Sequence, residues 1–161
     1  MIFLIVGDSG VGKSTIVSNI KNKLENVNII KSYTTRPKRN EKDNDHIFIK
    51  NKNEIKDEII ASTNINGYFY CTVKSQFQKG KINIYIVDDK GIVDTKNYFK
   101  DFYKIITLHI NRKNVNVSEE RKNRKIEKLN IKYDEEINND GDIETTTKEV
   151  LKCIKKYQKK N

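Results

Sequence analysis

Four runs of mostly apolar residues lie along the chain, separated by longer and more polar stretches. They are Ile2–Val6, Val27–Ile30, Ile82–Val87 and Ile105–Ile110. Short apolar runs of this kind are typical of strands that are buried on both faces of a parallel sheet. With helices between them, such strands form an α/β fold, and this is the fold class that the pattern predicts.

Two of the intervening stretches have the pattern of helices. Residues 14–24 follow the first strand after a glycine-rich loop, and residues 143–157 form an amphipathic pattern near the end of the chain. In the second stretch, Ile143, Val150 and Ile154 would share one apolar face and pack on the sheet.

The patterns in residues 32–80 are shorter and more mixed. Residues 45–49 alternate between polar and apolar and predict a strand, and the aromatic run at residues 67–73 predicts another. Helices are expected over residues 51–61 and 74–79.

Residues 114–129 form a highly charged stretch that is poorly suited to burial, and we expect an exposed or mobile helix there. The chain has one proline and no internal repeat, and its 161 residues are enough for a single core. We therefore expect one domain.

The loop after the first strand carries a phosphate-binding motif. Residues 7–15, GDSGVGKST, fit G-x-x-x-x-G-K-[ST] and lie between a predicted strand and a predicted helix, as that motif requires. Glycines let the backbone curl so that N–H groups point at an anion, and the helix start adds the positive end of its dipole. The motif predicts binding of a nucleoside triphosphate by Gly7, Ser9, Gly10, Val11, Gly12, Lys13, Ser14 and Thr15; the resemblance described below implies that this nucleotide is ATP.

Two side chains of this motif have distinct expected roles. Lys13 would bring positive charge to the terminal phosphates, and Ser14 would offer its hydroxyl to Mg²⁺, which prefers oxygen ligands. Asp88 ends an apolar strand, as a magnesium-supporting carboxylate beside a phosphate loop does, and is the second candidate metal ligand. The alternative is that Asp88 only caps the helix that starts near Lys90.

The net charge of +10 comes from 27 Lys and 5 Arg. The lysines are scattered along the chain, which indicates a solvated surface, so we do not expect a nucleic-acid partner. The arginines occur in two groups, and guanidinium binds phosphate bidentately. These groups indicate a site for several phosphates, formed by Arg36, Arg39, Arg112, Arg121 and Arg124.

No stretch approaches the ~20 apolar residues of a membrane span, and the first residues do not have the pattern of a signal peptide. Cys71 and Cys153 have neither metal-site spacing nor a disulfide framework. We expect a cytoplasmic protein with no membrane partner, either a monomer or a dimer.

Residues 32–39, with Ser32, Thr34, Thr35, Arg36 and Arg39 in place, resemble the S-x-T-T-R-x-P-R signature of guanylate kinases. Later segments of the chain resemble further motifs of that family in the same order. They are the Y-Y-G-T segment at residues 69–72, the D-x-x-G segment at 87–91 and the R-x-x-R lid spacing at 121–124. The resemblance extends over nearly the whole chain.

The resemblance implies a P-loop three-layer α/β/α fold with a parallel central sheet, a small NMP-binding insertion and a helical lid. All would belong to a single guanylate kinase-like domain, residues 1–161. Its parts would be a core of about 1–31, 81–112 and 130–161, an NMP-binding region of about 32–80 and a lid of about 113–129.

The resemblance also implies transfer of a phosphoryl group from ATP, with Mg²⁺, to a nucleoside monophosphate, foremost GMP or dGMP. The acceptor would be bound by Ser32, Arg36, Arg39, Tyr70, Thr72 and Asp88. The lid over the ATP phosphates would comprise Arg112, Arg121 and Arg124. The charges that act in catalysis would be those of Lys13, Arg36, Arg121 and Arg124.

Several positions depart from the family pattern. Lys38 stands where the family has proline, His46 where a phosphate-binding tyrosine is expected, and Cys71 where the family has glycine. Ala61 falls near the position of the carboxylate that reads guanine, so base and sugar preference stay open. The residues that could compensate are Glu58, Thr63 and Asp88.

Two functions other than guanylate kinase activity are compatible with these residues. The departures would suit a non-catalytic guanylate kinase-like module, although such a module has no need of Lys13. The positive charge would suit a nucleic-acid-linked NTPase. A kinase with changed base specificity is the nearest variant of the main hypothesis.

Overall fold

The central sheet of the computed structural model has five strands in the order β2-β7-β1-β8-β9, and all its neighbouring pairs are parallel. The strands are β1 (Ile2–Val6), β2 (Val27–Ile30), β7 (Ile82–Ile86), β8 (Ile105–Asn111) and β9 (Glu135–Asn138). The structure describes residues 1–116 and 128–159. Every residue of β1 is buried, as expected for the middle strand of a parallel sheet.

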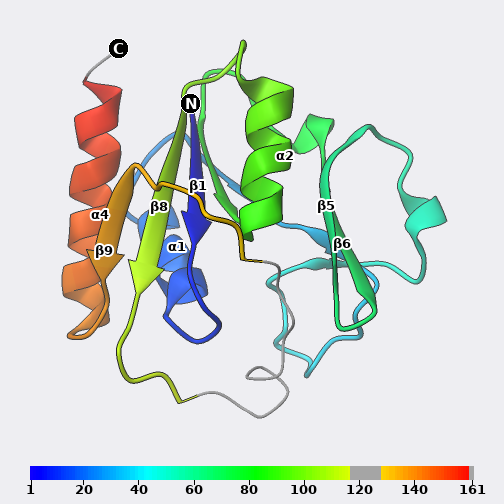
Figure 1. The fold of residues 1–161 in the computed structure, drawn as a ribbon, viewed down its shortest axis with the longest axis horizontal. Coiled ribbons are helices and arrows are strands. Elements are labelled where there is room, and N and C mark those ends of the chain that lie inside the picture. Colours follow the sequence, from blue (N-terminus) through cyan, green and yellow to red (C-terminus); the bar gives the residue numbers. More distant parts are fainter. Residues whose placement is uncertain (117–127, 160–161) are drawn as a thin grey trace.

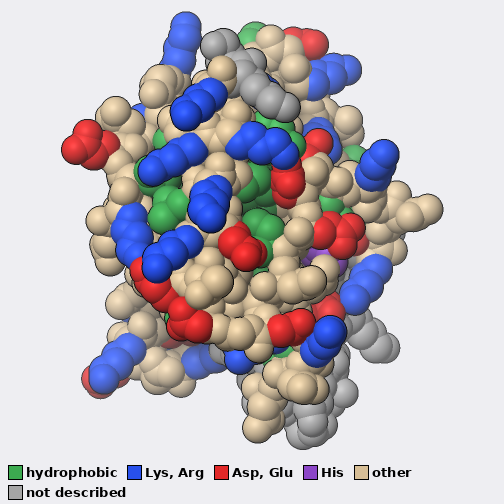
Figure 2. All heavy atoms as spheres, turned by 90° about the vertical axis from the view of Figure 1, so that its left-hand side faces the viewer, with side chains coloured by type: hydrophobic (Ala, Val, Ile, Leu, Met, Phe, Trp, Pro, Cys, Tyr) green, Lys and Arg blue, Asp and Glu red, His purple; other side chains and the backbone are tan. Residues whose placement is uncertain are grey.

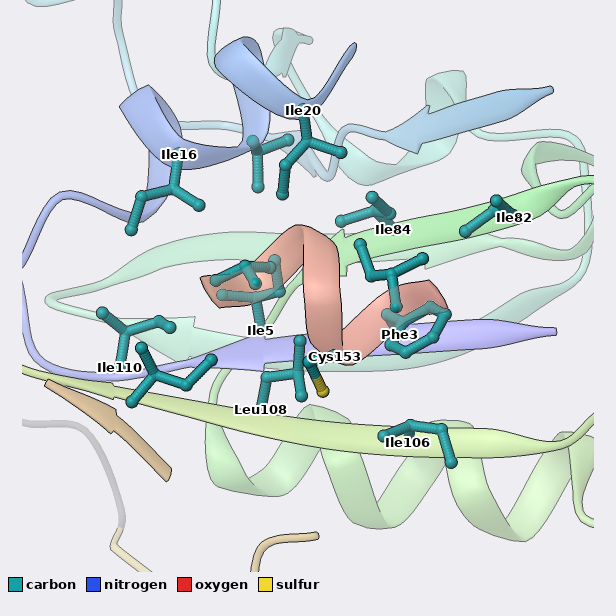
Figure 3. Close-up of a cluster of buried hydrophobic side chains, with 14 of the residues drawn as sticks. Phe3, Ile5, Ile16, Ile20, Ile82, Ile84, Ile106, Leu108, Ile110 and Cys153 are labelled. Carbon is teal, nitrogen blue, oxygen red and sulfur yellow. The ribbon is translucent and has the colours of Figure 1, made fainter. Parts of the chain in front are cut away.

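Helices cover both faces of this sheet (Figure 1). On one face, α1 (Lys13–Lys21) and α4 (Ile143–Gln158) pack on alternate residues of β1, Phe3 and Ile5 among them. Figure 3 shows the side chains of α1 pointing toward the apolar side chains of the sheet on this face. On the opposite face, the other β1 side chains pack with α2 (Asp89–Phe99). The expected three-layer α/β/α fold is confirmed.

A second, four-stranded sheet is formed by the chain between β2 and β7, with strand order β4-β3-β6-β5. Its strands are β3 (Tyr33–Thr34), β4 (Ile47–Phe48), β5 (Ile59–Ile65) and β6 (Tyr68–Val73). Strands β5 and β6 form a hairpin through Asn66 and Gly67, which both have positive φ, as a two-residue hairpin turn requires. Ile60 and Ala61 of β5 pack in the same apolar cluster as α2, which joins the second sheet to the core.

The prediction of a helix over residues 51–61 is wrong. The chain forms one 3₁₀ turn, η1 (Lys52–Glu54), closed by a capping box between Asn51 and Glu54, and then enters β5. Local polarity suited a helix, but pairing with β6 decides the conformation, and that pairing is not visible in a short window. The helix expected at residues 74–79 is likewise only a 3₁₀ turn, η2 (Lys74–Gln76).

The face that carries α4 and β9 is rich in charge, and Figure 2 shows its Lys and Arg side chains interspersed with Asp and Glu. Two ion pairs illustrate this mixing: Lys156 of α4 with Glu135 of β9, and Lys23, just after α1, with Glu144 of α4. Within the described residues, no helix is both long enough and apolar enough to cross a bilayer.

Candidate functional site: a phosphate loop facing a basic loop

The loop between β1 and α1 has the backbone that its glycines predict. Gly7, Gly10 and Gly12 all have positive φ, which L side chains rarely adopt. At Gly7 the chain also passes so close to β8 that a Cβ would lie 2.2 Å from the carbonyl oxygen of Ile110. The conformation of the loop therefore depends on glycine at these positions.

The two polar side chains at the start of α1 already have partners. The Lys13 Nζ donates to the carbonyl oxygens of Gly7 and Asp8, at 2.7 Å each, and so lies across the loop. The Ser14 Oγ donates to Oδ2 of Asp45 at 3.3 Å. Asp45 belongs to the loop before β4, so this contact joins the phosphate loop to the second sheet.

A third contact holds the loop from behind and was not anticipated from the sequence. Asn139, in the turn between β9 and α4, is fully buried and donates from Nδ2 to the carbonyl oxygen of Val11 at 2.8 Å. Thr146 donates to Asn139 Oδ1 at 2.7 Å. Asn139 is 128 residues from Val11 in the sequence, and no pattern of residues around it predicts this contact.

Beside the loop lies a hollow of about 140 Å³ at the carboxyl ends of β8 and β9. Arg112, expected over the ATP phosphates, lies on its wall. The lining residues are Asp8, Val11, Ile110, Asn111, Arg112, Lys113, Asn138 and Asp140. The carboxyl ends of parallel strands are where open α/β sheets bind ligands.

Arg36, expected to hold the acceptor phosphate, is 4% exposed. Its guanidinium donates to Asp43 Oδ2 at 2.9 Å and to the Pro37 carbonyl at 2.8 Å, while its Nε is buried without a partner. Asp43 also accepts from the backbone N–H of Arg39 at 3.1 Å. Asp43 was missed in the sequence, although an acid following two arginines is a natural ion-pair partner.

Charge and burial act in opposite directions on Asp43. Burial favours a raised pKa, but the hydrogen bonds from Arg39 and Arg36 and their positive charges outweigh it, so the pKa of Asp43 lies below its ordinary value. The carboxylate is therefore ionised at neutral pH and holds residues 35–46, which we call the basic loop, in a fixed shape.

His46 lies against this loop, with its ring 5.4 Å from that of Tyr70 and 6.2 Å from that of Phe48. Its Nδ1 is buried without a partner. Burial and the nearby charge of Arg36 lower the pKa of His46 to about 4. The imidazole is therefore neutral at physiological pH, and Tyr70, itself 8% exposed, packs against it.

The other expected acceptor-binding residues lie deeper. Thr72 is fully buried and donates to Gln76 Oε1 at 2.7 Å, and Ser32 is hydrogen-bonded to the Tyr85 hydroxyl at 3.1 Å. Ala61 and Thr72 are register partners on β5 and β6, which places the departure from the family pattern directly beside Thr72.

Asp88 is the N-cap of α2 and accepts from the N–H of Gly91 at 2.8 Å. Asp88 therefore does cap this helix, and an N-cap carboxylate still has lone pairs that can accept from other partners. Arg121 and Arg124, and most of the expected lid helix, fall in residues 117–127 and lie outside the described residues.

The chain is similar in sequence to proteins that are named guanylate kinase. It is 31% identical to the guanylate kinase of Thermotoga maritima over 110 residues, covering 62% of this chain and 53% of that protein. The guanylate kinase of Helicobacter hepaticus is 32% identical over 130 residues, covering 74% and 64%. That of Prochlorococcus marinus is 26% identical over 178 aligned positions, covering 96% of both chains.

In sequence, the chain is therefore similar to guanylate kinases. No protein-family model matches it. The fold has a solved counterpart in the crystal structure of guanylate kinase from Anaplasma phagocytophilum, with a TM-score of 0.66, 19% identity and coverage of 98% of this chain and 86% of that one. The resemblance drawn from residues 32–39 is thereby confirmed. The chain spans about half to two thirds of the length of the Thermotoga and Helicobacter guanylate kinases.

Proposed function

We propose that this chain transfers the γ-phosphoryl group of ATP to a nucleoside monophosphate, foremost GMP or dGMP, giving the diphosphate and ADP. The observation that carries the proposal is the hydrogen bond from Ser14 to Asp45, because it brings the phosphate loop against the loop that contains Arg36 and Arg39. A donor-phosphate site and a basic acceptor loop therefore face one another, as phosphoryl transfer requires.

The chemistry asks little covalent work of the protein. Phosphoryl transfer needs in-line positioning and neutralisation of the oxygens of the group in transit. Lys13 supplies charge on the donor side and Arg36 on the acceptor side. The acceptor phosphate is itself the nucleophile, so no general base is needed.

The oxygen atoms near the start of α1 are suitable ligands for Mg²⁺. The hydroxyl of Ser14 and the carboxylate of Asp45 are adjacent oxygen donors, and Mg²⁺ typically takes one or two protein oxygens together with substrate phosphates. We propose that Ser14 holds the ion with the nucleotide, and that Asp45 and Asp88 support it. Bound Mg²⁺ supplies neutralisation of the charge on the β- and γ-phosphates.

On the acceptor side, we propose that Arg36, Arg39, Ser32 and Tyr70 bind the phosphate of the monophosphate. The Nε of Arg36 is buried without a hydrogen-bond partner, and a phosphate oxygen of the acceptor would supply one. Thr72 and Asp88 would contact the base. On the donor side, Arg112 would lie over ATP with Arg121 and Arg124, and the hollow beside it would take the donor base.

The base preference depends on the pocket around Ala61. Ala61 is 3% exposed and cannot make the charge-assisted hydrogen bond of a carboxylate. We expect guanine to be selected less strongly than with a carboxylate, by about 1.5–3 kcal/mol. We also propose a cytoplasmic enzyme, since both substrates are cytoplasmic metabolites, acting as a monomer or dimer.

The test is a coupled ADP-release assay with Mg²⁺–ATP across the common ribo- and deoxyribonucleoside monophosphates. We expect turnover that depends on the acceptor and is fastest with GMP or dGMP. Lys13→Ala should lower kcat/KM at least about 100-fold, the scale for loss of a group that stabilises transition-state charge. Lys21→Ala, at the exposed end of the same helix, is the matched control.

Arg36→Ala should raise KM for the monophosphate and leave KM for ATP nearly unchanged, because the guanidinium lies on the acceptor side. Absence of acceptor-dependent turnover with every monophosphate would show that the proposed activity is wrong.

A further inference from the structure

We propose that Asn139 is a positioning residue of the ATP site: by holding the carbonyl of Val11, it aims the N–H of Gly12 at the phosphates. The proposal rests on the function proposed above for the phosphate loop. It adds a residue on a different element, far away in the sequence, to the machinery of that loop.

Three hydrogen bonds fix Asn139. Besides donating to Val11 and accepting from Thr146, its backbone N–H donates to the carbonyl of Asn111 at 2.7 Å. A carbonyl can only accept, so the side chain must present its NH₂ group to Val11 and its oxygen to Thr146. The amide orientation is therefore set by its partners, and complete burial removes water as a competitor.

The effect on the loop follows from peptide geometry. In a planar trans peptide the C=O of one residue and the N–H of the next point in opposite directions. Because the Val11 carbonyl is held toward Asn139, the Gly12 N–H points to the other side, into the curve of the loop. An N–H aimed at that position is what an anionic phosphate needs from a phosphate loop.

The close fit at Gly12 supports the same role. A Cβ at Gly12 would lie 2.6 Å from Nδ2 of Asn139, so the amide occupies the space that a side chain would take. Gly12 is also the N-cap of α1 and provides no side-chain acceptor for the first turn. The N–H groups in the first turn of α1 therefore receive no side-chain hydrogen bond from Gly12. Asn139 holds the loop at a different point, the carbonyl of Val11.

The test is calorimetric titration of Mg²⁺–ATP and, separately, of GMP into the wild-type chain and Asn139→Ala. We expect Kd for ATP to rise at least about tenfold, the scale of one hydrogen bond to a charged group, while Kd for GMP is unchanged. In the kinase assay, KM should rise for ATP and not for GMP.

The matched control is Asn19→Ala. Asn19 donates to Thr147 at 3.3 Å and also ties α1 to α4, but it does not touch the loop. If Asn139→Ala changed ATP and GMP binding equally, or left ATP binding as in Asn19→Ala, the positioning role would be wrong. Failure of the wild type itself to bind ATP would overturn the proposed function, and this proposal with it.

Thr146→Val gives a second measurement if Asn139→Ala does not fold. It removes only the hydroxyl that orients the amide, with little change of volume, and should raise Kd for ATP by a smaller factor. Thr146→Ser keeps the hydroxyl and should restore the wild-type value. Equal ATP affinity in the wild type and Thr146→Val would contradict the proposal.

Discussion

The phosphate loop and the basic loop that faces it are built in different ways. The shape of the phosphate loop depends on its backbone. Its glycines have positive φ, Gly7 lies close against β8, and the buried amide of Asn139 holds the loop from behind. The shape of the basic loop, residues 35–46, depends on contacts between side chains. The buried guanidinium of Arg36 pairs with Asp43, and the neutral imidazole of His46 packs among aromatic rings.

The difference bears on the positions at which the sequence resemblance indicates departures from the family pattern. A loop whose glycines have positive φ tolerates few exchanges, because L side chains are strained there and, at Gly7, a Cβ would meet the carbonyl oxygen of Ile110. A loop shaped by side-chain pairs can exchange one partner for another if charge and volume are kept. Of the departures expected from the sequence, Lys38 and His46 lie in the basic loop, whereas Ala61 and Cys71 lie on β5 and β6.

The largest effect is expected on the backbone-built side, for Gly7→Ala. The new Cβ would meet the Ile110 carbonyl at 2.2 Å and would force an L residue into φ +146°. We expect a loss of at least about 3 kcal/mol in the free energy of unfolding, measured in urea, with loss of ATP binding.

Gly80→Ala is the matched control for this substitution, because Gly80 has a φ of +82° but open space at its Cβ. It should cost only the conformational strain, about 1 kcal/mol, and should leave ATP binding intact. Equal losses for both variants would mean that the contact with β8 does not matter.

The next effect concerns pH and the basic loop. The pKa of His46 is lowered from 6.5 to about 4 in the folded chain. Between these two pH values the unfolded chain is protonated at His46 and the folded chain is not. The free energy of unfolding should therefore fall as the pH drops from about 6.5 to about 4, by up to about 3 kcal/mol, and this contribution should level off below.

Urea unfolding at pH 7.5, 5.5 and 4.5 measures this slope, and His46→Gln should flatten it. The charged neighbours that act on His46 are Arg36, Arg39, Asp43 and Asp45. Because the pKa of Asp43 is below its ordinary value of 3.8, its ion pair persists through this window. Identical slopes for the wild type and His46→Gln would contradict the assignment.

Asp43→Ala should have a somewhat smaller effect that is local to the acceptor side. It leaves the Arg36 guanidinium, 4% exposed, without its carboxylate partner. We expect the free energy of unfolding to fall by about 1–3 kcal/mol. KM for GMP should change while KM for ATP stays the same. Glu41→Gln, an exposed acid in the same loop, is the control and should change neither constant.

The smallest effect is expected for Glu58→Gln. Glu58 pairs with Lys74 at 3.2 Å, but both side chains are more than half exposed, so solvent screens the pair. We expect no measurable change in the unfolding midpoint. A clear loss would show that charge pairs support the second sheet even where they are exposed.

The sequence by itself determined the phosphate loop and four of the five strands of the central sheet, all but β9. Both depend on local rules: apolar runs form buried strands, and the glycine spacing of residues 7–15 allows one backbone shape. The final helix was also determined in this way, because Val150 and Ile154 recur at helical spacing and both pack on the sheet.

Only the tertiary structure decided the rest. Residues 59–65 are a strand because β6 pairs with them, and a local window favoured a helix. Asp45 reaches Ser14 across 31 positions, and Asn139 reaches Val11 across 128. Contacts between residues so distant in the chain depend on how the strands are ordered in the sheet, so no local pattern of residues could predict them.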